Sequence, residues 1–185
     1  MKATPIIEGS RRQLTLFVPP DVSAPIEHIR QLVDPVQYAL IAAHVTLCRD
    51  EELAIESISA LIARLGEITL QPLTLEFGPP QRFSDHGALL PCTSGSHAFH
   101  QLRTLVLGTP TVRDLSAHIT LAHPRNPRAS ANVEASFAAL LAPLSIRFVD
   151  LCLIEQSAGG PWTVRHRFTL GSSNVREILP TSAIL

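Results

Sequence analysis

Two short motifs in the chain combine histidine with threonine at a spacing that suits acid-base chemistry. Residues His44–Leu47 read HVTL, and residues His118–Leu121 read HITL 74 positions later. A single copy would be weak support for a site, but a repeated pair is a strong signal. In a strand, side chains at i and i+2 point to the same face. Each histidine therefore shares a face with its threonine, while the aliphatic residues of the motif turn into the core.

The two polar pairs would form a phosphate-sized site if an approximate twofold axis brought them together. Histidine titrates near neutral pH, so one imidazole can act as a base while the other acts as an acid. The hydroxyls of Thr46 and Thr120 would hydrogen-bond the non-bridging oxygens of a phosphoryl group and stabilise its transition state. This chemistry requires no metal, and we expect neither a metal nor another cofactor.

The composition limits the class of partner. The chain has 185 residues, of which 45% are hydrophobic and 17% charged, and this suffices for a single globular domain over residues 1–185. Its 15 basic and 16 acidic residues give a net charge of −1, so no broad positive field is available to hold a long nucleic-acid duplex. We therefore expect a monomeric protein whose partner is a nucleotide or a short RNA end.

The cysteines and the apolar runs bear on the location of the protein. Cys48, Cys92 and Cys152 form no C-x-x-C pair and lie in apolar surroundings, which is typical of buried free thiols in a reducing compartment. The first residues lack the apolar stretch of a signal peptide, and no run of about 18 apolar residues is available to span a bilayer. We expect a cytoplasmic protein without a membrane partner.

The hydrophobic periodicity predicts an alternation of strands and helices. Strands are expected over Arg12–Val18, Leu40–Leu47, Thr69–Phe77, Phe83–Leu90, Ala117–Ala122, Ser145–Glu155 and Trp162–Leu170. Helices are expected over Ala24–Asp34, Asp50–Leu65, Ser94–Leu107 and Asn132–Leu141. These strands are too short, and too often joined as hairpins, for a doubly wound parallel sheet. The expected fold is α+β, with two pseudo-symmetric lobes of antiparallel sheet, flanking helices and an active-site cleft between the lobes.

On these motifs the chain resembles the two-histidine (2H) phosphoesterase superfamily, which includes the bacterial 2′-5′ RNA ligase-like proteins and the cyclic phosphodiesterases. The resemblance covers roughly Arg12–Leu170 in motif number, spacing and element order. It implies that the paired motifs act without metal on 2′,3′-cyclic phosphate ends or related phosphodiesters. Carried over residue by residue, it gives the catalytic places to His44, Thr46, His118 and Thr120. It suggests His118 as the base and His44 as the acid, with the roles exchanged when the reaction is reversed.

Five further residues are candidates for binding the substrate. RNA ligase-like members of the superfamily often carry an arginine or an aromatic residue five positions after the second motif histidine, where this chain has His123. Arg49 holds the equivalent place after the first motif, and Arg125 follows in the second loop. Phe17 and Phe83 lie beside the expected cleft strands, where a phenylalanine either stacks on a base or belongs to the core.

Two classes of function remain open on the sequence. The first is a phosphoesterase, running in the hydrolytic or the ligating direction, on RNA ends, cyclic nucleotides or an ADP-ribose cyclic phosphate. The second is a non-catalytic module that binds a nucleotide or an RNA end in the same cleft. His97 and His100 have a spacing that suits a metal, but no third ligand matches them, so a zinc site is not expected.

Overall fold

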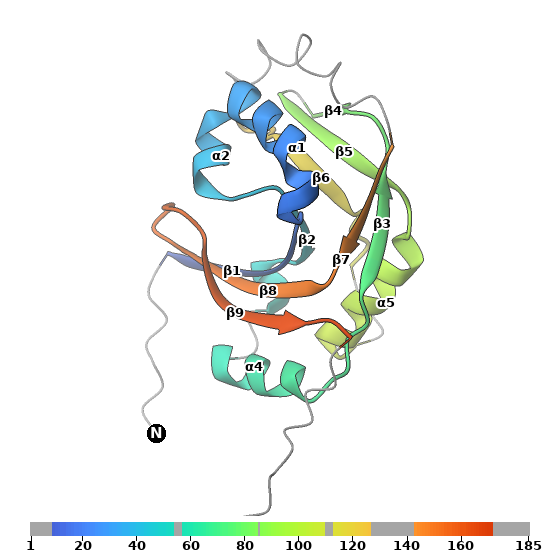
Figure 1. The fold of residues 1–185 in the computed structure, drawn as a ribbon. Helices are drawn as coiled ribbons and strands as arrows, with labels where there is room; N and C mark the ends of the chain where they lie inside the picture. The colour runs from blue at the N-terminus through green and yellow to red at the C-terminus, as the bar shows by residue number, and fades with distance from the viewer. Residues whose placement is uncertain (1–8, 54–56, 85, 110–112, 127–142, 172–185) are drawn as a thin grey trace, which may run out of the picture.

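The computed structural model describes residues 9–53, 57–84, 86–109, 113–126 and 143–171, which form two antiparallel sheets with helices packed on them (Figure 1). The expected α+β fold is confirmed. The first sheet has the order β2-β1-β8-β9, made of β1 (Ser10–Phe17), β2 (His44–Cys48), β8 (Asp150–Ser157) and β9 (Thr163–Thr169). The second has the order β4-β5-β3-β7, with β6 paired to β5, and is made of β3 (Leu73–Phe77), β4 (Gln81–Phe83), β5 (Gly87–Ser94), β6 (His118–Ala122) and β7 (Leu144–Phe148). The helices are α1 (Pro20–Val33), α2 (Pro35–Leu40), α3 (Asp50–Leu53), α4 (Ile58–Gly66) and α5 (Ser96–Leu107).

Each motif occupies a strand that has one partner in its own sheet. Strand β2 pairs with β1, and β6 pairs with one edge of β5. The other edge of β5 pairs first with β4 and then, further along the strand, with β3. The trios β2-β1-β8 and β6-β5-β3 are therefore built alike. Strands β2 and β6 also contact each other, so the two sheets meet at the motifs.

One expected strand divides between the two sheets. The run Ser145–Glu155 forms β7, which pairs with β3, and β8, which pairs with β1 and β9. The positions that face the main core change phase at the break, from Ile146 and Phe148 before it to Leu151 and Leu153 after it. On the other face of β8, Cys152 and Ile154 are buried in a second, small cluster. Because side chains alternate with a period of two, this change of phase marks a crossover from one sheet to the other. The first sheet is thus assembled from both ends of the described chain.

The strand of the first motif begins later than expected. Instead of a strand from Leu40, helix α2 runs to Leu40, and β2 starts at His44 itself. Asp34 caps α2 by accepting a hydrogen bond from the backbone N–H of Gln37, and Pro35 is favourable in the first helical turn. The first motif therefore begins its strand instead of ending one that starts at Leu40.

Other differences from the expected elements are smaller. The region expected as one helix from Asp50 contains α3 and α4, and the strand expected from Phe83 is divided into β4 and β5. The expected helix Asn132–Leu141 lies outside the described residues. Within the described ranges, no helix has the length and apolar character needed to cross a bilayer.

Candidate active site

The two motifs have the same pattern of burial along their strands. In β2 the side chains of Val45 and Leu47 are fully buried, whereas His44 and Thr46 remain partly exposed. Strand β6 repeats the pattern, with Ile119 and Leu121 in the core and with His118 and Thr120 partly exposed. The aliphatic side chains anchor each strand, and the histidine and threonine of each motif share the other face.

The motif histidines also make the same hydrogen bond. Nδ1 of His44 lies 2.8 Å from the carbonyl oxygen of Ala42, and Nδ1 of His118 lies 2.8 Å from that of Ser116. A carbonyl oxygen can only accept, so each Nδ1 carries a proton and donates. In its neutral form, each ring therefore has its lone pair on Nε2. This arrangement leaves one nitrogen on each imidazole able to accept or release a proton.

The two histidines differ in how readily they take up a proton. Burial lowers the pKa of His44 from 6.5 to about 4, and the charges of Arg30 and His118 lower it further, against the hydrogen bond to Ala42. The contact between β2 and β6 brings the charge of His118 within reach of His44. His44 is therefore neutral at neutral pH and has the protonation state of a base.

The lowered pKa of His44 predicts a specific dependence on pH. An NMR titration of the His44 ring should give a midpoint near pH 4 instead of 6.5. The unfolded chain takes up this proton near pH 6.5 and the folded chain only near pH 4. Folding stability should therefore fall as pH is lowered across that window. In urea unfolding, the His44→Gln variant should lose this part of the pH dependence. A His44 midpoint near 6.5 would contradict the account.

An aromatic ring accompanies each histidine. Phe17 is the residue opposite His44 in the β1-β2 pairing, and their ring centroids are 6.2 Å apart. Phe83 ends β4, and its ring centroid is 6.3 Å from that of His118. Phe83 is 49% exposed, whereas Phe17 packs against a small apolar cluster of Ile41, Cys152 and Ile154. Phe83 therefore offers the more open ring surface.

The loop after β6 is attached to the helices of the other half of the molecule. The buried carboxylate of Asp34 accepts hydrogen bonds from the backbone N–H of His123 and from the Asn126 amide, both at 2.8 Å. Nδ1 of His123 accepts from the backbone N–H of Arg125, so a neutral His123 carries its proton on Nε2. Burial, followed by the charge of Arg125, lowers the pKa of His123. His123 is thus kept neutral, with an Nε2–H donor.

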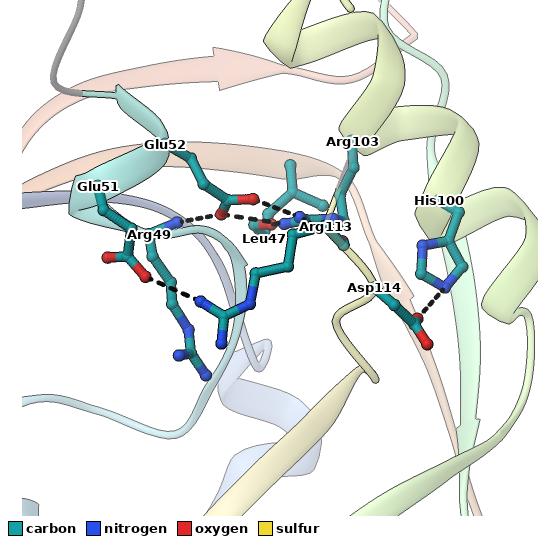
Figure 2. Close-up of polar contacts among 8 residues, drawn as sticks. All are labelled: Leu47, Arg49, Glu51, Glu52, His100, Arg103, Arg113 and Asp114. Atoms are coloured by element: carbon teal, nitrogen blue, oxygen red, sulfur yellow. Dashed lines mark hydrogen bonds and ion pairs between the residues drawn. The ribbon is translucent and has the colours of Figure 1, made fainter. Parts of the chain in front are cut away.

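Arg49 lies at the far end of β2 from His44, beside a buried ion-pair network (Figure 2). The Arg49 backbone N–H donates to Glu52, and the Arg49 guanidinium extends away from that carboxylate. Glu52 pairs at 2.5 Å with Arg103 of α5, whose side chain is fully buried. Arg103 also donates to the carbonyl oxygens of Leu47 and Arg113. Arg103 thus connects the end of the first motif to the segment that leads to the second. The structure shows no contact between Arg49 and either motif histidine.

Several residues around the site were not singled out by the sequence. They are Glu27, Arg30, Asp34, Glu52 and Arg103, whose roles depend on contacts with distant or looped segments. Only Asp34, which precedes Pro35, carries a local signal as a helix cap. Within the described ranges, no three His, Cys, Asp or Glu side chains come together as metal ligands.

Two like-built sheets thus present a histidine and a threonine each, from strands that contact each other. The sequence profile of the 2′-5′ RNA ligase superfamily matches residues 18–160. The chain belongs to this superfamily, among the two-histidine phosphoesterases.

Solved structures show the same fold. E. coli LigT complexed with 3′-AMP is 19% identical, with a TM-score of 0.59 over 89% of this chain and 100% of that chain. E. coli LigT complexed with NADP+ is also 19% identical, with a TM-score of 0.60 over the same shares. A structure described as a phosphoesterase is 19% identical, with a TM-score of 0.59 over 88% of this chain and 99% of that chain. A search of curated proteins finds no match.

Proposed function

We propose that this protein is a metal-independent phosphodiesterase that opens 2′,3′-cyclic phosphates on nucleotides or short RNA ends. The observation that carries the proposal is the pair of imidazoles on contacting strands, each with Nδ1 bonded to a backbone carbonyl and Nε2 left for proton transfer. E. coli LigT has been solved with 3′-AMP and with ATP, which supports a nucleotide-sized substrate. The net charge of −1 favours such a substrate over a long duplex.

The reaction requires one base and one acid. Nε2 of one histidine removes a proton from water as the water oxygen attacks phosphorus. The bond between phosphorus and the ribose 3′-oxygen breaks, and the leaving oxygen takes a proton from Nε2 of the other histidine. Each proton transfer contributes about 10²- to 10⁴-fold to the rate. The product is a 2′-phosphomonoester.

The lowered pKa of His44 supports His44 as the base in hydrolysis and His118 as the acid. A group with a pKa of about 4 is unprotonated in the free protein at neutral pH and is therefore available to accept a proton. This assignment is opposite to the one that the family resemblance suggests. In the reverse reaction, ligation or cyclisation, the two roles are exchanged.

The remaining polar groups would stabilise the phosphoryl oxygens. Thr46 and Thr120 lie two residues after their histidines on the partly exposed face, as oxygen-binding hydroxyls require. In the loop after β6, the Nε2–H of His123 and the guanidinium of Arg125 are further donors for an anion. Arg49 is proposed as a contact with a more distant part of the substrate, because it lies beyond the end of β2.

The test is the time course of 2′,3′-cyclic AMP incubated with protein that has been treated with EDTA. We expect conversion to a phosphomonoester at a rate unaffected by the chelator. Tight binding without product would instead establish a binding module in the same cleft. Turnover that appears only after a divalent metal is added would contradict the proposed mechanism.

The exposed ring of Phe83 supports a base-stacking role beside His118. The Phe83→Ala variant should raise KM for 2′,3′-cyclic AMP, because stacking on an aromatic ring contributes about 1–3 kcal/mol per base. Its stability should change little, since the side chain is 49% exposed. Leu105→Ala is a matched control, because Leu105 is equally exposed on α5. An unchanged KM in the Phe83 variant would remove this ring from the binding site.

A further inference from the structure

An ion pair on α1, buried at its arginine and partly buried at its glutamate, holds the segment that leads into the first motif. Glu27 and Arg30 are one helical turn apart and pair at 2.6 Å, with the Arg30 side chain only 3% exposed. A carboxylate oxygen of Glu27 accepts from the backbone N–H of Ala43 at 2.5 Å. The guanidinium of Arg30 donates to the carbonyl oxygen of Ile41 at 2.7 Å. The ion pair thus hydrogen-bonds the backbone of the residues on both sides of Ala42.

Ala42 is the residue that orients His44. Its carbonyl oxygen is the acceptor for Nδ1 of the imidazole. Because the peptide units on both sides of Ala42 are bound by α1, the position of this carbonyl oxygen depends on Glu27 and Arg30. A displacement of the acceptor would turn the ring and move Nε2, and a misplacement of 1 Å in an active site can cost about 10²-fold in rate.

The corresponding segment before His118 shares the part of this arrangement that belongs to the sheets. The carbonyl oxygen of Ala43 accepts from the backbone N–H of Val18, and that of Ala117 accepts in the same way from Cys92. This backbone bond is therefore common to both motifs. Among the described residues, an ion pair that binds the backbone on both sides of the acceptor residue is seen only beside His44. Arg103, the buried arginine on the approach to His118, donates to the carbonyl oxygen of Arg113 and not to the residues next to Ser116. The ion pair is a difference between two otherwise similar halves.

The pair is poorly suited to a purely stabilising role. Removing the Arg30 charge from water costs several kcal/mol, and a buried ion pair is often no better than apolar residues of the same volume. Nε of Arg30 is buried and has no hydrogen-bond partner among the described residues, which adds a further cost. Apolar residues could not make the hydrogen bonds to Ile41 and Ala43, so positioning the first motif is a role that only a polar pair can fill.

We infer that Glu27 and Arg30 are positioning residues that fix the His44 imidazole through residues 41–43 and distinguish it from His118. The expected change in kcat rests on the proposed function. The expected change in the pKa of His44 does not. Arg30 on α1 and His118 on β6 are the charged or titratable groups whose fields lower the pKa of His44. Removing the charge of Arg30 should therefore raise that pKa.

The test compares Arg30→Met, Arg30→Lys and Glu27→Gln by NMR titration of His44 and by kcat for 2′,3′-cyclic AMP. Arg30→Met should move the His44 midpoint to higher pH and lower kcat about 10- to 100-fold, with a smaller effect on KM. Arg30→Lys keeps the charge and should restore the midpoint, with part of kcat. Glu27→Gln should lower kcat while Arg30 still carries its charge.

Arg64→Met is the matched control, because Arg64 also lies on a helix and donates to a backbone carbonyl, that of Val106, at 2.8 Å. It should leave both the His44 midpoint and kcat unchanged. A wild-type midpoint and kcat in Arg30→Met would overturn the inference. If this variant does not fold, a wild-type kcat in both Arg30→Lys and Glu27→Gln would overturn it instead. Absence of turnover in the wild-type protein would contradict the proposed function alone, since the titration still decides whether Arg30 acts on His44.

Discussion

Replacing either His44 or His118 with alanine is expected to lower kcat for 2′,3′-cyclic nucleotides by about 10²- to 10⁴-fold. Each ring supplies the only proton acceptor or donor on its side of the phosphate in the proposed mechanism, and each is held by the same hydrogen bond. Both side chains are partly exposed, so the variants should keep the fold. The measurement is kcat at a saturating concentration of substrate, with circular dichroism to verify folding.

The double variant sharpens this prediction. Residues that act as a unit show strongly non-additive losses, so His44→Ala combined with His118→Ala should be little slower than the worse of the two single variants. His28→Ala serves as the control, because His28 is an exposed histidine on α1. Two single losses that simply multiply, or substantial activity in either single variant, would show that the two imidazoles do not work together.

The second large effect is expected for stability. Arg103→Met should lower the free energy of unfolding by about 3–5 kcal/mol, the range for breaking a buried ion pair by removing one partner. Arg103 is fully buried and binds Glu52, Leu47 and Arg113, so its loss leaves a carboxylate and two carbonyl oxygens without this donor. Urea unfolding at neutral pH measures the change.

The neighbouring pair of Arg113 and Glu51 provides a control in the same region (Figure 2). Both side chains are more than half exposed, at 61% and 58%, and exposed ion pairs contribute little to stability. Arg113→Met should therefore cost less than about 1 kcal/mol. Equal effects for Arg103→Met and Arg113→Met would contradict a special role for the buried network.

The sequence predicted the parts of the site that depend on local periodicity. The alternation of polar and aliphatic residues in the two motifs correctly indicated which side chains are buried, because a strand places alternate residues on opposite faces whatever its partners are. The repetition of the motif correctly indicated two similar halves. Phe17 and Phe83 were also expected near the motif strands, and each lies beside a motif histidine.

The parts that could not be predicted depend on contacts between distant residues. Arg103 is 51 positions from Glu52 and 56 from Leu47, and no periodicity connects residues so far apart. Arg30 donates to the carbonyl oxygen of Ile41, which follows α2. This helix was not expected, because the apolar run indicated a strand from Leu40. The exchange of sheets after Phe148 could not be predicted, because residues 151–154 of β8 are buried on both faces and continue the apolar run without a break in the sequence.

Identification of the product formed from 2′,3′-cyclic nucleotides tests the central claim most directly. EDTA-treated protein is incubated with each of the four cyclic nucleotides, and the 2′- and 3′-phosphates are separated by chromatography. The mechanism predicts a single 2′-phosphomonoester, formed at the same rate with and without the chelator and at least about 100-fold more slowly by the His44→Ala and His118→Ala variants. A mixture of both isomers, a product that requires added metal, or an undiminished yield in either variant would contradict it.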